Sequence, residues 1–149
     1  MIIHLSDTFN SHLAISPISQ HGIVFQNLTS FLSLLNTQIG LAYQDISLTQ
    51  RIVQYLNCLQ LKNNENRFYH DSLSVDEFGV AKKLLAWRDQ LYLSGWDETI
   101  ENNGSKRLND LAEIEKLAAK KVSPNEGQKL GLIKLKLKKY HTQIKKIHL

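Results

Sequence analysis

Two acidic side chains, Glu113 and Glu115, lie close enough in the sequence to raise the question of a shared metal ion. A metal nuclease needs carboxylates that converge on one cation. Residues two apart in a helix point to different faces. The string Glu113-Ile114-Glu115-Lys116 also has no strand context and no Pro-Asp pair before it. We therefore predict that these residues do not form a nuclease site.

Histidine spacing gives no stronger sign of a metal site. The chain has 6 histidines, and no two of them form the H-x-x-x-H pair that places two ligands on one helical face. His4, His12 and His21 are near one another in sequence, but their spacing matches no known metal motif. We predict no metal site and no cofactor in this chain.

Phosphate-binding and nucleophile motifs are absent from the sequence. Gly104-Ser105-Lys106 lacks the glycine-rich run of a P-loop, and neither G-x-G-x-x-G nor G-x-S-x-G occurs. Cys58 is the single cysteine, on the apolar side of a predicted helix, so we expect a buried structural thiol. One cysteine also excludes an internal disulfide and fits a reducing, cytoplasmic location. We predict no catalytic residue.

The densest group of functional residue types is Trp87, Arg88, Asp89 and Trp96. One interpretation places Trp87 or Arg88 against a ligand or a partner. The other is a core tryptophan together with a buried or interface arginine that holds another segment of the chain. We favour the second interpretation.

Charge is unevenly distributed along the chain, whose net charge is +4. Between Met1 and Gln60 the charged side chains are Asp7, Asp45 and Arg51, whereas lysines dominate from Lys120 onward, with Glu126 as the one acid there. A lysine-rich segment attracts polyanions such as DNA by releasing counterions. The alternative is a solvated helix face, because lysine without arginine or interleaved aromatics is a weak signal for nucleic acid.

The elements that must position these residues are mostly helical. Apolar periodicity predicts helices over about 27–39, from 47 to a polar turn at 63–66, and over 74–93, 106–120 and 123–141. Asn27 can cap the first helix, and S-x-x-Q or S-x-x-E patterns predict capping boxes at Ser47, Ser74 and Ser123. The predicted inward-facing side chains include Ile52, Val53, Leu56 and Leu59 of the second helix and Leu108, Leu111 and Ile114 of the fourth.

Extended segments are short. Residues 2–5 read as a strand, residues 22–25 as a second strand or the lead-in to a helix, 67–70 as an irregular or extended piece, and 144–149 as an extended piece. The predicted fold is predominantly α with an α/β edge, with about five helices and one or two short strands. A length of 149 residues indicates one domain, and no apolar run approaches the roughly 20 residues of a membrane helix.

Residues 67–97, RFYHDSLSVDEFGVAKKLLAWRDQLYLSGWD, carry a family resemblance. The string resembles the N-terminal region of AddB-like proteins of the PD-(D/E)XK nuclease family, the large helicase–nuclease-type proteins of bacterial double-strand-break repair. The matching residues are Phe68, Tyr69, Ser72, Val75, Asp76, Gly79, Ala81, Leu84, Leu85, Trp87, Arg88, Asp89, Leu91, Gly95, Trp96 and Asp97. Leu34–Leu41 and the final KKIHL are similar to further segments of that region.

The resemblance implies a non-catalytic segment, because the nuclease carboxylates and the divalent metal of such proteins lie near the far C-terminus. Residues 1–149 would then be one N-terminal domain, or a fragment of a larger helicase-like α/β domain, that contacts DNA or a partner subunit. Lys134, Lys138 and Lys139 are the candidate DNA-binding residues, while Trp87, Arg88, Asp89, Trp96 and Asp97 are family-motif residues without an assigned role. The alternative is a free-standing helical protein–protein interaction module, and DNA binding discriminates between the two.

Overall fold

The computed structural model describes residues 2–5, 22–41, 46–99, 104–139, 142 and 144–148. The chain forms two compact units, one made of residues 1–43 and 132–149 and the other of residues 44–131. We call them the α/β unit and the helical unit. The described residues contain six helices and a small parallel sheet, which confirms a predominantly α fold with an α/β edge. The third strand and one short helix exceed the predicted number of elements.

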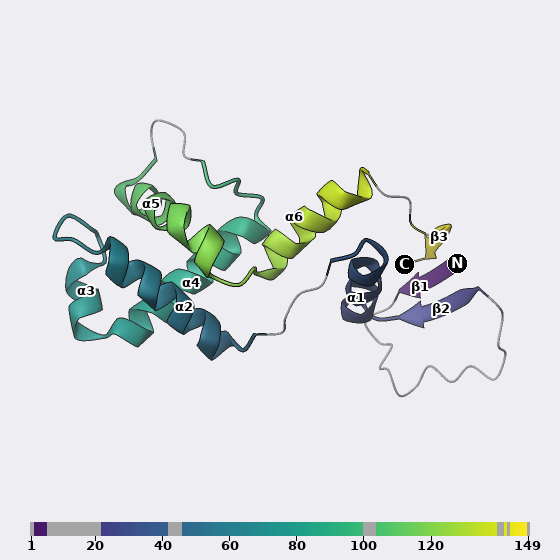
Figure 1. Ribbon diagram of the computed structural model, residues 1–149, viewed down its shortest axis with the longest axis horizontal. Coiled ribbons are helices and arrows are strands. Elements are labelled where there is room, and N and C mark those ends of the chain that lie inside the picture. Colours follow the sequence, from purple (N-terminus) through teal and green to yellow (C-terminus); the bar gives the residue numbers. More distant parts are fainter. Residues whose placement is uncertain are drawn as a thin grey trace. The chain divides into compact units, whose positions relative to one another are not determined.

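The sheet of the α/β unit has three short parallel strands. They are β1 (Ile2–Leu5), β2 (Ile23–Gln26) and β3 (Lys146–His148), in the order β2-β1-β3 (Figure 1). Ile3 of β1 pairs with Val24 on one side and with Ile147 on the other. The segment at 22–25, for which the sequence left two interpretations, is therefore a strand that leads directly into the first helix.

Helix α1 (Leu28–Gln38) begins where Asn27 accepts a hydrogen bond from the Ser30 amide at 2.8 Å, as predicted. Its apolar face packs with Ile3 of the central strand, because apolar residues recur along it at helical spacing. The buried cluster consists of Ile3, Phe31, Leu35, Ile39 and Ile133. Gly40 follows with φ +67°, the left-handed conformation that glycine adopts at helix ends.

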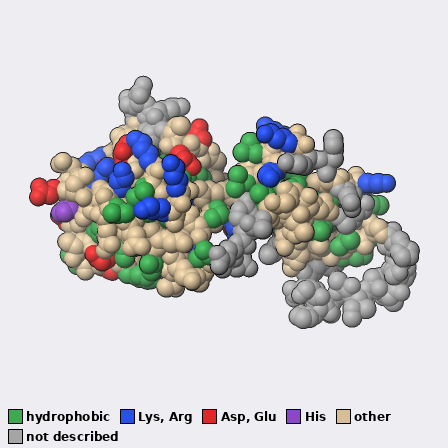
Figure 2. All heavy atoms as spheres, viewed as in Figure 1, with side chains coloured by type: hydrophobic (Ala, Val, Ile, Leu, Met, Phe, Trp, Pro, Cys, Tyr) green, Lys and Arg blue, Asp and Glu red, His purple; other side chains and the backbone are tan. Residues whose placement is uncertain are grey.

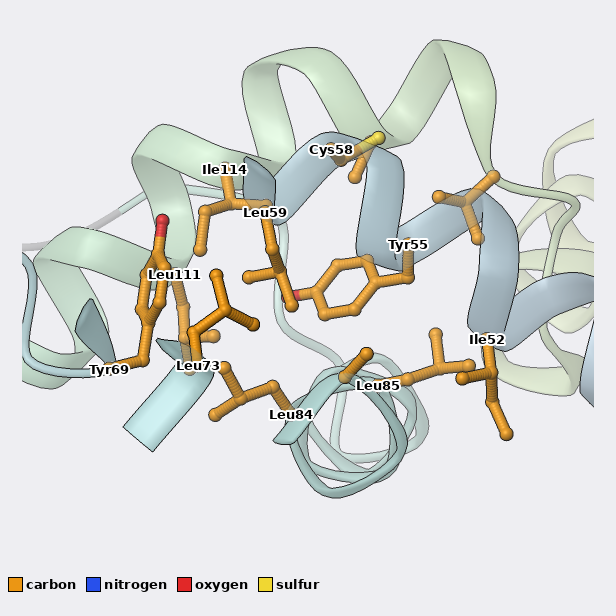
Figure 3. Close-up of a cluster of buried hydrophobic side chains, with 13 residues drawn as sticks. Ile52, Tyr55, Cys58, Leu59, Tyr69, Leu73, Leu84, Leu85, Leu111 and Ile114 are labelled. Atoms are coloured by element: carbon orange, nitrogen blue, oxygen red, sulfur yellow. The ribbon is translucent and has the colours of Figure 1, made fainter. Parts of the chain in front are cut away.

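The helical unit contains α2 (Leu48–Lys62), α3 (His70–Val75), α4 (Glu77–Leu93) and α5 (Lys106–Lys121). Helix α2 packs against both α4 and α5. Figure 3 shows the side chains of the core between these helices, which include Ile52, Tyr55, Cys58, Leu59, Tyr69, Leu73, Leu84, Leu85, Leu111 and Ile114. Cys58 is fully buried there, and burial raises the pKa of its thiol, which confirms a structural cysteine.

Two of the three predicted capping boxes are wrong. The Ser47–Gln50 box is present, but α4 begins at Asp76, whose carboxylate accepts the Gly79 amide at 2.8 Å. Ser74 instead belongs to the short helix α3, which was not predicted and which occupies the residues before that cap. The next box lies two residues later than expected.

That later box opens α6 (Glu126–Leu137). Asn125 accepts the Gln128 amide at 2.7 Å, and the Gln128 side chain accepts the Asn125 amide at 3.2 Å. Asn125 therefore takes the capping position that we assigned to Ser123. The helix was predicted to reach residue 141, which lies outside the described residues, but it ends at Leu137.

Two predicted core positions are exposed. Val53 is 45% exposed and Leu108 is 37% exposed. The buried stripe of α2 runs through Ile52, Tyr55 and Leu59, so Val53 lies one residue, about 100°, around the helix from it. Leu108 lies in the first turn of α5, before the buried stripe begins at Asp110 and Leu111.

Candidate functional site

Lys134, Lys138 and Lys139, the candidate DNA-binding residues, are all exposed at the C-terminal end of α6. We call them the α6 lysine cluster. Cations near a helix C-terminus are favoured by the partial negative charge of the last carbonyl groups. Figure 2 shows Lys and Arg side chains at the surface of both units. The positions of the three lysines are therefore accessible to a large anion.

The described residues of the α/β unit carry charge of one sign. They contain no Asp or Glu, whereas Lys145 and Lys146 at the start of β3 are exposed in addition to the α6 lysine cluster. With no carboxylate among the described residues of the unit, these cations produce a positive potential at its surface. Such a surface favours a polyanion over a neutral partner.

Arg88, by contrast, is buried in the core of the helical unit. It lies on the inward face of α4, one turn after Leu84 and Leu85, and is 1% exposed. Its Nε and Nη2 atoms donate hydrogen bonds of 2.6 and 2.7 Å to Glu115 of α5, which is also 1% exposed. Burial alone would lower the pKa of Arg88, but the hydrogen bonds and charge of Glu115 outweigh burial and raise it above the usual value.

The pair is extended by neighbouring polar groups. Arg88 Nη2 also donates to the Gln128 side chain at 3.3 Å, and the Tyr92 hydroxyl lies 2.7 Å from Oε1 of both Glu115 and Glu98. Burial and these two carboxylates raise the pKa of Tyr92, so that the hydroxyl stays protonated and able to donate. The network ties α4, α5 and the first turn of α6 together.

Asp89 has a separate partner. The Arg51 guanidinium of α2 donates two hydrogen bonds of 2.8 Å to its carboxylate, the bidentate geometry that arginine forms with carboxylates. Asn125, the cap of α6, donates a third at 2.9 Å, and Arg51 Nε also donates to the Ser123 carbonyl at 3.2 Å. Arg88 and Asp89 thus hold different segments, although Arg88 Nη1 lies 3.7 Å from Asp89 Oδ1.

The remaining motif residues lie nearer the surface. Trp87 is only partly buried against the core, so the expected core tryptophan is a peripheral one. Trp96 Nε1 donates to the Thr99 carbonyl at 2.9 Å, and the Asp97 carboxylate accepts from the amide and hydroxyl of the same threonine. These bonds order the turn after α4. The buried arginine of our favoured interpretation is confirmed.

Sequence reasoning missed the partner of that arginine. Glu115 lies four residues after Leu111 and three before Ala118, on the buried stripe of α5. A charged side chain on an apolar stripe needs a buried partner of opposite charge. Arg88 shows the same signal on α4, so the two stripes together would have indicated the pair.

The described residues contain no group of His, Cys, Asp and Glu side chains that could hold a metal ion. The six described helices are also each too short or too polar to cross a membrane. No family model matches this chain, and no curated protein and no solved structure shows significant similarity to it.

Proposed function

We propose that this chain is the non-catalytic N-terminal part of a cytoplasmic bacterial DNA-repair nuclease of the AddB-like type. In this proposal the α/β unit contributes to a helicase-like scaffold, and the α6 lysine cluster contacts the DNA backbone. A divalent metal would act in the nuclease domain of the parent protein. The proposal starts from the resemblance of residues 67–97. The parallel sheet of the α/β unit supports its scaffold part.

The single observation that carries the scaffold proposal is that, among the described residues, the sheet face opposite Ile3 is only partly buried and adds no residue to the buried cluster. The buried cluster of the α/β unit takes Ile3 from β1, but it contains neither Ile2 and Ile23 nor Phe25, which is 39% exposed. Parallel sheets occur almost only with both faces covered. The sheet is therefore typical of a part of a larger α/β domain.

The charge of the same unit supports the DNA contact. Its described residues are basic without an opposing carboxylate, and the α6 lysine cluster is exposed. Each phosphate that a lysine neutralises releases counterions, which gives affinity that falls steeply with salt. Lysine is a point-charge phosphate ligand, so the contact would be independent of DNA sequence.

Binding of labelled duplex and single-stranded oligonucleotides tests this contact. We expect Lys134→Glu, Lys138→Glu and Lys139→Glu together to abolish binding at moderate salt. The salt slope of the wild type should exceed that of the variant by about two units on a single strand or about three on a duplex.

The matched control replaces Lys82, Lys106 and Lys120, which are exposed lysines of the helical unit, with glutamate. It changes net charge by the same amount and should leave most of the binding intact. Equal losses in the two triple variants would mean that net charge alone drives binding. Unchanged affinity in the first variant would exclude the α6 lysine cluster.

The family proposal has its own test, which is the sequence of the source gene beyond the codon for Leu149. An open frame that continues for several hundred codons to a Pro-Asp … (Asp/Glu)-x-Lys pattern is expected. A stop codon at that point would contradict the proposal.

The second candidate function, a helical protein-interaction module, is favoured by one observation. Leu61, Val75 and Phe78 are 65%, 87% and 45% exposed. A hydrogen bond of 3.1 Å between Gln60 and Glu77 holds the end of α2 beside the start of α4, near these side chains. If DNA binding is absent at low salt, a pull-down that compares the wild type with Leu61→Ser and Phe78→Ser would test this module.

A further inference from the structure

A surface pocket of about 300 Å³ lies in the helical unit, between the Phe68–Tyr69 turn, α3, α4 and the start of α5. Two aromatic side chains, Phe68 and Trp87, line it together with two cations, Lys83 and Arg107. Lys83 Nζ lies 5.5 Å from the centre of the Trp87 ring, and the Arg107 guanidinium lies 5.9 Å from that of Phe68. Each of these two aromatic rings therefore has a positively charged side chain beside it.

The lining residues include no carboxylate. Asp110, a buried acid, accepts hydrogen bonds from Arg67 and from the Phe68 amide, so its charge is neutralised by its own partners. Lys83 and Arg107 are both exposed. Their charges therefore remain available to an incoming anion.

Tyr69 also lines the pocket, although its hydroxyl oxygen is buried. Its side chain is 2% exposed, and its hydroxyl has no hydrogen-bond partner among the described residues. Buried polar groups are almost always paired, because an unpaired one loses its hydration without compensation.

We propose that this pocket binds one nucleotide unit of single-stranded DNA, with the base stacked on Trp87 and the phosphate at Lys83 and Arg107. Aromatic rings beside basic side chains are the usual means of binding single strands, because every base has a face that can stack. The pocket volume is at the lower end of ligand sites and suits one nucleotide rather than a large cofactor. This inference deepens the proposed function and rests on DNA being the ligand of this chain.

Tryptophan fluorescence reports on the pocket directly. The chain has 2 tryptophans, so Trp96→Phe leaves Trp87 as the one emitting side chain. Stacking of a base on Trp87 should quench this emission when an oligothymidine is added. A full-length variant whose Trp87 emission does not respond to a saturating oligothymidine would overturn the stacking.

A second measurement needs no tryptophan change. Lys83→Gln with Arg107→Gln should weaken oligothymidine binding by about tenfold in fluorescence anisotropy, since two phosphate contacts are lost. The control is Lys82→Gln with Lys106→Gln, the neighbouring exposed lysines outside the pocket lining, which should bind like the wild type. Equal affinities of the two double variants would overturn the proposal.

Two competitors distinguish single-stranded DNA from duplex DNA and from a free nucleotide as the ligand. Duplex DNA should displace the oligothymidine poorly, because its bases are not free to stack, and thymidine monophosphate should bind much more weakly than the oligomer. If duplex competes equally, or if only the monophosphate binds, the single-strand proposal is wrong.

The charge-reversed α6 lysine cluster variant separates this inference from the proposed function. Loss of binding in that variant alone, with the Lys83 and Arg107 double variant unaffected, contradicts the pocket and supports the proposed contact. The reverse result contradicts the α6 contact and retains the pocket.

Discussion

Arg88 of α4 and Glu115 of α5 form a fully buried ion pair, joined by hydrogen bonds of 2.6 and 2.7 Å. Two charges removed from water carry a desolvation cost that their mutual attraction only partly offsets. The cost is reduced here because Gln128 and Tyr92 supply further hydrogen bonds to the pair. The arrangement fixes which faces of three helices meet.

Glu115→Ala should destabilise the protein by about 3–5 kcal/mol, because it leaves Arg88 charged and buried without its partner. Urea unfolding at neutral pH measures the change. Glu113→Ala is the control, since Glu113 pairs with Lys116 at the surface of the same helix and should cost about 0–1 kcal/mol.

Arg88→Met combined with Glu115→Leu should cost less than Glu115→Ala alone, since no buried charge remains. If the single variant loses less than 1 kcal/mol, the pair is not buried in solution as described here.

Gly127 and Gly131 of α6 provide a matched pair of glycine-to-alanine changes. A Cβ on Gly127 would lie 2.6 Å from the Tyr92 carbonyl carbon and 2.7 Å from the Leu93 nitrogen, both backbone atoms at the end of α4. A Cβ on Gly131 would meet no atom within 4 Å. Only the first substitution therefore forces the first turn of α6 away from α4.

Gly131→Ala should stabilise α6 by about 1 kcal/mol through helix propensity. Gly127→Ala has the same propensity gain but should destabilise by about 1–3 kcal/mol, as overpacking does. Thermal unfolding followed by circular dichroism measures both. A gain in stability for Gly127→Ala would show that the two helices do not approach as closely as the structure indicates.

Gly79 is tied to the cap of α4 in a different way. A Cβ there would lie 2.0 Å from Asp76 Oδ2, whose carboxylate caps the helix through the Gly79 amide. Gly79→Ala should therefore gain about 1 kcal/mol of stability from helix propensity. It should lose a similar amount because the added methyl group displaces the Asp76 cap.

We expect Gly79→Ala to give no net gain in the wild type but to stabilise an Asp76→Ala background by about 1 kcal/mol. The unfolding free energies of the four proteins measure this coupling. The same effect in both backgrounds would mean that the added methyl group does not disturb the cap.

Much of the helical pattern was predictable because it depends on local periodicity. Apolar side chains at helical spacing placed α1, α2, α4 and α5 within a few residues, and Asn27 and Ser47 were recognised as caps. These signals lie within one turn of the element that they define.

One error, the cap of α6, arose where a nonlocal contact determined the structure. Asn125 rather than Ser123 caps α6 because Asn125 also donates to Asp89, while the Ser123 amide and carbonyl are taken by Gln54 and Arg51 of α2. A sequence pattern does not contain these partners, which lie tens of residues away. The Arg88 ion pair was missed for a different reason, because the charged residues on the apolar stripes of α4 and α5 were not considered together.

His148 of β3 provides a pH-dependent test of the sheet. Its ring stacks on that of His4 with 4.6 Å between centres, and the rings of His4 and Phe25 are 5.0 Å apart. Partial burial, then the charge of Lys146 and then His4 lower the pKa of His148 below its ordinary value of 6.5. The folded sheet therefore favours neutral His148.

Because the unfolded chain binds this proton more readily than the folded one, the contribution of His148 to stability is present above pH 6.5 and is lost as pH falls through the lowered pKa. An NMR titration of the imidazole protons in the full chain should show His148 titrating below pH 6.5. Lys146→Gln should move that titration back toward the ordinary value, because it removes a neighbouring positive charge. A His148 titration at or above 6.5 in the wild type would mean that the His148 ring does not lie beside Lys146 and His4 in solution as the structure places it.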